Sequence, residues 1–141
     1  MNFKNPPREE IRQLLERTQT IAVVGLSPKR ERDSFHVASA LQQFGYKVIP
    51  VHPGPDRILN EPVVHDLRDV VKCDLVDVFR KSEHVAEIVD LCIAKGFKAL
   101  WLQEDVIDEA AAERARKAGI LVIMDRCILK EWIALMGSSA A

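Results

Sequence analysis

The sequence predicts an α/β fold: a single Rossmann-like, doubly wound sandwich of about five parallel strands flanked by helices. Two observations carry this prediction. Short, almost entirely apolar segments recur along the 141 residues, and helical patterns separate them. Apolar strands of this kind are typical of a parallel sheet buried on both faces, and right-handed crossovers then give the doubly wound arrangement. The predicted strands span residues 21–24, 48–51, 75–79, 99–102 and 120–124.

The helices are predicted from the spacing of apolar residues and from their end signals. Ser34 is expected to cap a helix that ends at Gly45, and Asp108 to open an alanine-rich helix closed by Gly119. The clearest apolar stripe lies between Ser82 and Gly96 and consists of Val85, Ile88, Val89, Cys92 and Ile93. Two further helices are expected around Ile11, Leu14 and Leu15, and through Ile128, Leu129, Trp132, Ile133 and Met136.

The length of the chain suits one domain. Residues 1–17 are expected to form an N-terminal helix packed on the domain, residues 18–136 the ligand-binding Rossmann-like domain, and residues 137–141 a flexible tail. The segment 53–70 is too rich in proline and glycine for a full crossover helix. An irregular excursion that covers the site is expected there.

Composition excludes several classes of function. The 20 Lys and Arg balance 21 Asp and Glu, so no net field draws the chain to nucleic acid or to an anionic membrane. No apolar run approaches the ~20 residues that span a bilayer, and the first residues lack a secretory signal, so we expect a cytoplasmic protein. The 3 cysteines contain no CxxC pair and the 4 histidines no tight ligand spacing, so neither a disulfide framework nor a metal site is expected.

The loop after the first strand is the strongest candidate for binding an anion. Ligands of open α/β sheets bind outside the carboxyl ends of the strands. Gly25 permits close backbone approach, Ser27 and Ser34 offer hydroxyls, and Lys29 and Arg30 add positive charge. A helix beginning near Ser34 would also point its free N–H groups at the ligand. The loop is therefore predicted to bind phosphate, the alternative being an ordinary charged surface loop.

Polar residues also follow the third and fourth predicted strands. Arg80 either clamps a phosphate or pairs with Asp77 or Glu83, and the sequence leaves both open. Packing is the expected role of Trp101, because an indole buries a large area. Gln103, just beyond, is placed to hydrogen-bond an adenine edge or an amide.

The usual nucleotide motifs are absent. The first loop lacks GxGxxG, and the second strand ends at His52 where a ribose-binding acid would stand. The GxxxxGK[ST] loop is missing as well. For catalysis, Cys127 stands near the start of the last helix, where a helix N-terminus lowers the pKa of a thiol, but a buried structural thiol is the favoured interpretation.

Five ordered segments resemble the small stand-alone CoA-binding proteins, which are similar to the CoA-binding domain of the succinyl-CoA synthetase alpha subunit. The segments are IAVVGLSPKRERDS (21–34), KVIPVHP (47–53), DLVDVFRKSE (74–83), ALWLQEDV (99–106) and AGILVIMDRC (118–127). The resemblance implies a Rossmann-like domain that binds CoA or an acyl-CoA across the strand-end loops. The candidate cofactor-binding residues are then Gly25, Leu26, Ser27, Lys29, Arg30, Ser34, Val51, His52, Pro53, Phe79, Arg80, Trp101 and Gln103.

The resemblance has two departures and one limit. The family usually has Asn at the position of His52 and Gly at that of Asp105. The catalytic phosphohistidine of the synthetase belongs to a further domain, so ligase activity is not implied for this chain.

The sequence therefore leads to the hypothesis of a non-catalytic module that binds CoA or an acyl-CoA, as a carrier or a sensor. One alternative is an enzyme that acts on an acyl-CoA thioester or a pantetheine thiol through Cys127. Another is a protein that binds NAD or a nucleotide. No nucleic acid or membrane partner is expected, and a homodimer through an apolar patch on a terminal helix is the protein contact we consider.

Overall fold

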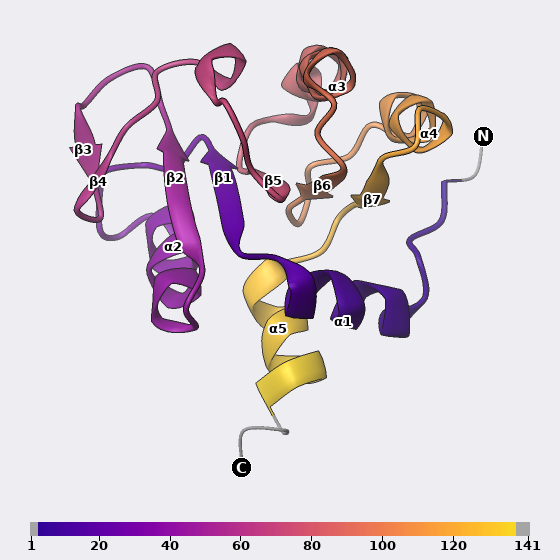
Figure 1. The fold of residues 1–141 in the computed structure, drawn as a ribbon, viewed down its shortest axis with the longest axis horizontal. Helices are drawn as coiled ribbons and strands as arrows, with labels where there is room; N and C mark the ends of the chain where they lie inside the picture. Colours follow the sequence, from indigo (N-terminus) through magenta and orange to yellow (C-terminus); the bar gives the residue numbers. More distant parts are fainter. Residues whose placement is uncertain (1–2, 138–141) are drawn as a thin grey trace.

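Five parallel strands form the central sheet in a computed structural model that describes residues 3–137 (Figure 1). Each predicted strand is confirmed to within one residue at either end. The sheet confirms the predicted Rossmann-like α/β fold. Its strands are β1 (Thr20–Val24), β2 (Lys47–Val51), β5 (Leu75–Val78), β6 (Ala99–Leu102) and β7 (Leu121–Ile123).

The order of these strands places a topological switch point between β1 and β5. The sheet runs β2-β1-β5-β6-β7, so the chain leaves β1 in one direction to form β2 and then crosses back to form β5. At such a point the loops after two neighbouring strands diverge to opposite faces of the sheet and leave a crevice. The carboxyl ends of β1 and β5 flank this crevice.

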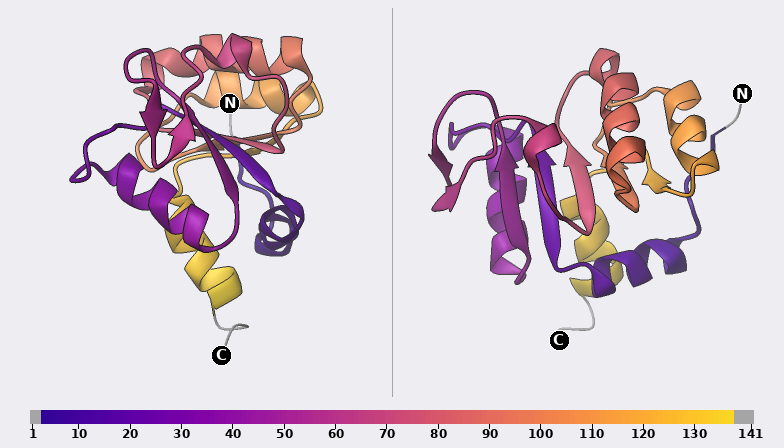
Figure 2. Two further views of the ribbon diagram at one scale, coloured as in Figure 1. Left: turned by 60° about the vertical axis from the view of Figure 1, so that its left-hand side comes forward. Right: turned by 45° about the horizontal axis from the view of Figure 1, so that its top comes forward.

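Helices cover both faces of the sheet (Figures 1 and 2). Along β1, Ala22 and Val24 belong to one apolar core, and Ile21 and Val23 belong to the other. The α3/α4 face is covered by α3 (Val85–Lys95), α4 (Glu109–Lys117) and the 3-10 helix η1 (Leu67–Asp69). The α1/α2/α5 face is covered by α1 (Arg8–Arg17), α2 (Asp33–Gln43) and α5 (Ile128–Met136).

Local signals determine several of the helix ends. Asp108 caps α4 as predicted, since its side chain accepts a hydrogen bond from the N–H of Ala111 at 3.0 Å. Gly96 ends α3 with a φ of 72°, a conformation that glycine adopts without steric cost. The predicted cap at Ser34 is wrong, because α2 begins at Asp33 and Arg32 holds the cap position.

The excursion after β2 contains more regular structure than the sequence predicts. It forms an antiparallel hairpin of β3 (Arg57–Ile58) and β4 (Glu61–Pro62), followed by η1. Leu59 and Asn60 make its turn, with φ of 54° and 63°. Leu-Asn is not a usual residue pair for such a turn, so the turn signals in the sequence did not predict the hairpin.

The first and last helices of the domain pack against each other. Ile11, Leu14 and Leu15 of α1 are buried, and α1 contacts α5. Of the predicted tail, residues 138–141 lie outside the described residues. No helix within residues 3–137 has both the length and the apolar character needed to cross a membrane.

Candidate functional site

A cleft of about 900 Å³ opens at the switch point, on the α3/α4 face of the sheet. Its size falls within the range of small-molecule sites. Three groups of residues line it: the ends of β1, β2 and β5, the segment that enters η1, and one side of α3. They are Val24, Gly25, Val51, His52, Pro53, His65, Asp66, Leu67, Arg68, Phe79, Arg80, Glu87, Ile88, Asp90, Leu91 and Ala94.

Gly25 allows the first loop to pass close to the end of β5. Its φ is 85°, and a Cβ atom at this position would lie 2.6 Å from the carbonyl oxygen of Phe79. Its N–H donates a hydrogen bond of 2.9 Å to the carbonyl oxygen of Val51, so this N–H already has a partner. Only glycine combines this conformation with this approach.

Arg80 brings an unpaired positive charge to the cleft. Its side chain is exposed and forms no ion pair or hydrogen bond with any residue of the described part of the chain. Neither partner considered from the sequence holds it, because Asp77 bonds to Gln103 and Glu83 lies 4.0 Å from His84. Arg80 is therefore available to an anion.

His52 presents one ring nitrogen to the backbone and leaves the other available. The N–H of Gly54 donates a hydrogen bond of 2.9 Å to Nδ1 of His52, so a neutral ring carries its proton on Nε2. A Cβ atom at Gly54 would lie 3.0 Å from Cε1 of this ring. An imidazole N–H donor thus stands where the resembled family usually has the amide donor of Asn.

Ser27 of the first loop and Ser34 of α2 stabilise the shape of this loop. The N–H of Ser27 donates to Oγ of Ser34 at 3.0 Å, and the N–H of Lys29 donates to Oγ of Ser27 at 3.1 Å. Ser34 is buried, while Lys29 and Arg30 are exposed at the tip of the loop. None of the four lines the cleft.

Trp101 and Gln103 are committed to the interior. Trp101 is completely buried on the α1/α2/α5 face, and its indole N–H donates to the carbonyl oxygen of Arg126 at 2.9 Å. This confirms its predicted packing role. Gln103 is 4% exposed and donates from Nε2 to Oδ1 of Asp77 at 2.6 Å. Neither lines the cleft.

The structure thus divides the candidate residues into two groups. The first group lines the cleft and consists of Gly25, Val51, His52, Pro53, Phe79 and Arg80. The second group does not line it and consists of Leu26, Ser27, Lys29, Arg30, Ser34, Trp101 and Gln103. Leu26 belongs to the second group because it is fully buried on the α1/α2/α5 face.

One wall of the cleft comes from the excursion, and sequence reasoning predicted it only in general terms. Asp66 accepts hydrogen bonds from the N–H and the guanidinium of Arg68, at 2.9 and 2.8 Å. These bonds lower the pKa of Asp66 to about 2. The charge of Arg68 is thereby matched by a carboxylate, unlike that of Arg80.

The other wall comes from α3, which the sequence pattern did not predict. Its lining residues Glu87, Asp90, Leu91 and Ala94 follow the helical spacing i, i+3, i+4, i+7, next to the buried stripe. The spacing can be read from the sequence, but the four residues are a mixture of acidic and apolar types, so they do not stand out as a stripe. A helix face beside the buried stripe can be recognised as a wall of a cleft only when the segment that lies opposite it is known.

The cysteines lie away from the cleft. Cys127 occupies the cap position of α5 and packs, half-buried, on the α1/α2/α5 face. Burial raises the pKa of Cys73 to about 11 and that of Cys92 to about 12, so both are thiols at neutral pH. Within residues 3–137, no three His, Cys, Asp or Glu side chains gather as a metal site would require.

A parallel sheet with this strand order and a cleft at its switch point defines the class of Rossmann-like α/β proteins. Within this class the chain belongs to the CoA binding domain family, whose model matches residues 19–133.

The chain is similar to a protein of nearly the same length, and solved structures share its fold. The protein YneT of Bacillus subtilis (strain 168) is 36% identical over 127 residues, which cover 89% of this chain and 94% of YneT. A hypothetical protein from Pyrococcus horikoshii OT3 superposes with a TM-score of 0.88 at 34% identity, over 97% of this chain and 100% of that one. The dinucleotide forming acetyl-coenzyme A synthetase 1 of Ca. Korarchaeum cryptofilum shares the fold, with a TM-score of 0.65 at 23% identity over 74% of this chain and 25% of the synthetase.

Proposed function

We propose that the protein binds CoA or an acyl-CoA in the cleft at the switch point, as a non-catalytic carrier or sensor module. Membership of the CoA binding domain family supports a CoA-related binding role. The observation that carries the proposal is Arg80, which lines the cleft with no counter-ion among residues 3–137. The phosphates of CoA would supply the counter-ion that the Arg80 guanidinium lacks.

The neighbours of Arg80 suit the same ligand. His52 offers an Nε2–H donor at the end of β2, and Gly25 keeps the end of β1 free of side-chain atoms. Lys29 and Arg30 are exposed on the loop between β1 and α2. In this proposal they attract the phosphates and contact the part of the ligand that extends beyond the cleft.

The chemistry of the lining favours binding over catalysis. Among the described residues that line the cleft there is no Cys, Ser, Thr or Lys to act as a nucleophile. The enzymatic alternative depends on Cys127, which packs on the opposite face of the sheet. Binding of NAD would favour a ribose-binding acidic residue at the end of β2, but Val51 and His52 stand there.

The first experiment is native mass spectrometry of the freshly purified protein, followed by calorimetric titration with CoA, acetyl-CoA, NAD and ATP at equal concentrations. A copurified CoA mass, or selective binding of CoA or acetyl-CoA, is the expected result. Tighter binding of NAD or ATP, or no binding of either CoA compound, would overturn the proposal. Release of free thiol from acyl-CoAs above the buffer rate would overturn its non-catalytic part.

A further inference from the structure

The amino ends of the parallel strands lie along the edge of the sheet opposite the carboxyl edge, and the strand arrows of Figure 1 point away from it. The chain enters these ends through residues 17–20, 44–47, 70–75, 95–99 and 117–121. Every one of these segments carries positive charge, and Asp74 is their one acidic residue. The basic residues, which we call the amino-edge row, are Arg17, Lys47, Lys72, Lys95, Lys98 and Lys117.

Much of this positive charge has no counter-ion. Arg17, Lys72 and Lys98 are exposed, and their side chains form no ion pair or hydrogen bond with any residue among 3–137. The carboxylate of Asp74 is engaged elsewhere, because its Oδ2 accepts hydrogen bonds of 2.9 and 3.0 Å from backbone N–H groups that lead into β1. The amino-edge row is therefore available to an anionic partner.

Helix termini account for only part of the amino-edge row. Arg17, Lys95 and Lys117 stand in the last turns of α1, α3 and α4, where a cation stabilises the helix dipole. The other members of the row belong to no helix. Positive charge at this edge thus exceeds what the helices use.

Val71 places an apolar side chain at the centre of the row. The strand order is β2-β1-β5-β6-β7, so β5 is the middle strand, and Val71 lies in the segment that enters it. Val71 is 92% exposed, and Lys72 follows it directly. A partner that covers this edge would bury one apolar side chain within a rim of positive charge, an arrangement typical of protein interfaces.

The length of the row suits an extended peptide. Neighbouring strands lie about 4.8 Å apart, so the amino ends of the sheet span about 19 Å. An extended chain rises about 3.3 Å per residue, and roughly six residues cover this distance. Alternate side chains of such a segment face the same way, so acidic residues on one face would meet successive cations of the row.

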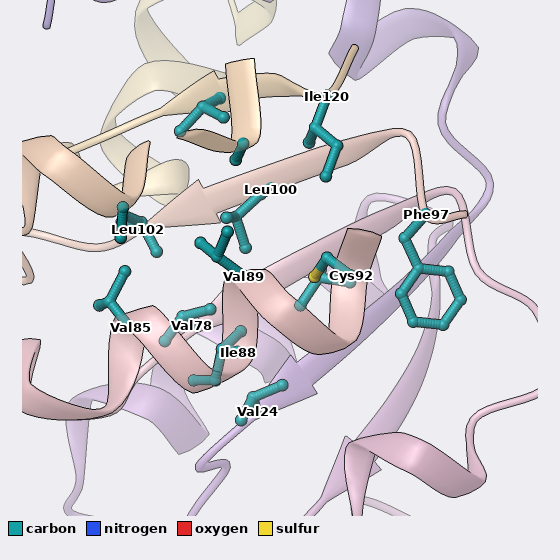
Figure 3. Close-up of a cluster of buried hydrophobic side chains, with 14 of the residues drawn as sticks. Val24, Val78, Val85, Ile88, Val89, Cys92, Phe97, Leu100, Leu102 and Ile120 are labelled. Atoms are coloured by element: carbon teal, nitrogen blue, oxygen red, sulfur yellow. The ribbon is translucent and has the colours of Figure 1, made fainter. Parts of the chain in front are cut away.

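The composition of the edge favours a protein partner over nucleic acid or a membrane. Phe97 is 6% exposed and belongs to the apolar cluster of Figure 3, Phe44 stacks on Trp132, and the hydroxyl of Tyr46 donates to a backbone carbonyl of α1. These rings are thus engaged within the domain, whereas single-stranded nucleic acid needs free aromatic faces for stacking. A membrane surface calls for several exposed apolar side chains, but Val71 is the exposed large one in these segments.

We infer that the amino-edge row docks an acidic, extended segment of a partner protein, and that Val71 contacts an apolar residue of this segment. Ammonium groups of lysine attract the carboxylates of such a segment and set its position along the edge. No member of the row lines the cleft, so the partner can bind whether the cleft is empty or filled. The inference is independent of the proposed function.

The probe for the test is a fluorescently labelled peptide, Glu-Glu-Glu-Leu-Glu-Glu-Glu, whose central leucine can reach Val71. Dissociation constants are measured by fluorescence anisotropy for the wild type, Lys72→Glu, Lys98→Glu and Val71→Ser, in about 0.1 M salt, which screens charges more than about 10 Å apart. Lys81→Glu is the matched control, because Lys81 is an exposed lysine that follows β5 at the carboxyl edge. Melting temperatures are recorded for every protein.

The expected result is that the wild type binds the peptide saturably. Lys72→Glu and Lys98→Glu each weaken binding about fivefold, because an attraction becomes a repulsion. Val71→Ser weakens binding about threefold with no change of charge. Lys81→Glu changes the affinity by less than about twofold, and all melting temperatures stay the same.

Absence of saturable binding to the wild type would overturn the inference, as would a Lys81→Glu variant that loses as much affinity as Lys98→Glu. An unchanged affinity for Val71→Ser would remove the apolar contact from it. Tighter binding of a single-stranded thymidine oligonucleotide, or of phosphatidylserine vesicles, would overturn the assignment of a protein partner. None of these measurements involves CoA, so their failure leaves the proposed function untouched.

Discussion

Gln103 donates a hydrogen bond of 2.6 Å from Nε2 to Oδ1 of Asp77, which is completely buried in β5. The other carboxylate oxygen, Oδ2, has no hydrogen-bond partner within residues 3–137. A buried carboxylate with an unpartnered oxygen favours its proton, and burial raises the pKa of Asp77 to about 7, against the opposing effect of the bond from Gln103. The pair therefore makes folding depend on pH.

The stability contributed by Asp77 is expected to fall as the pH rises. Its ordinary pKa is 3.8, so between pH 4 and pH 7 the folded protein keeps a proton that the unfolded chain has lost. By pH 8 the loss reaches on the order of 4 kcal/mol. Asp77→Asn removes the titrating group and keeps an oxygen that accepts from Gln103. Urea unfolding from pH 4 to pH 8 should show a weaker decline for this variant than for the wild type.

Glu31→Gln is the matched control for the pH dependence, because it neutralises an exposed carboxylate. Its curve of stability against pH should follow that of the wild type. Parallel curves for Asp77→Asn and the wild type between pH 4 and pH 8 would show that Asp77 is ionised in the folded state throughout this range.

Arg80→Ala is expected to weaken CoA binding by about tenfold to a hundredfold, the effect of removing a hydrogen bond to a charged group. The melting temperature should hold, because the exposed guanidinium has no partner among the described residues. Arg8→Ala, at an exposed residue of α1 outside the cleft, is the control and should bind CoA like the wild type. Calorimetry decides, and equal affinities for the two variants would exclude Arg80 from the site.

Gly25→Ala is expected to destabilise the fold by roughly 2 kcal/mol or more, because a methyl group would meet the carbonyl oxygen of Phe79 at 2.6 Å. Gly45→Ala separates this clash from backbone strain. Gly45 has a φ of 104° but no atom within 4 Å of an added Cβ, so it should lose only about 1 kcal/mol. Urea midpoints measure both losses, and equal losses would mean that β5 moves to accommodate the methyl group.

Asp105→Gly is expected to change stability by less than about 1 kcal/mol and to leave CoA affinity unaltered. Asp105 adopts a φ of 68°, and its N–H donates to Oδ1 of Asp125 at 2.8 Å, a bond that glycine retains. Its carboxylate is absent from the cleft lining. The same calorimetric and urea measurements apply, with Asp125→Ala as the variant that loses the bond. A change in CoA affinity for Asp105→Gly would bring this position into the site.

Local signals made much of the fold predictable. The strands were found because each is a short apolar run, and two helix ends because Asp108 and Gly96 act on the backbone beside them. The end of β1 was predicted to border a ligand site because Gly25 follows an apolar strand at the carboxyl edge, and Gly25 lines the cleft. These features depend on residues that are neighbours in the chain.

The sequence by itself determined the strands, most of the helices and the edge of the sheet at which the cleft opens. Only the tertiary structure decided which strand-end residues share the cleft. Strands buried on both faces carry no alternation of polar and apolar residues, so the sequence does not show that Gln103 is absent from the cleft lining while Arg80 belongs to it. The cleft is likewise a product of packing, because the walls that η1 and α3 give it are separate in sequence and meet only when the sheet is assembled.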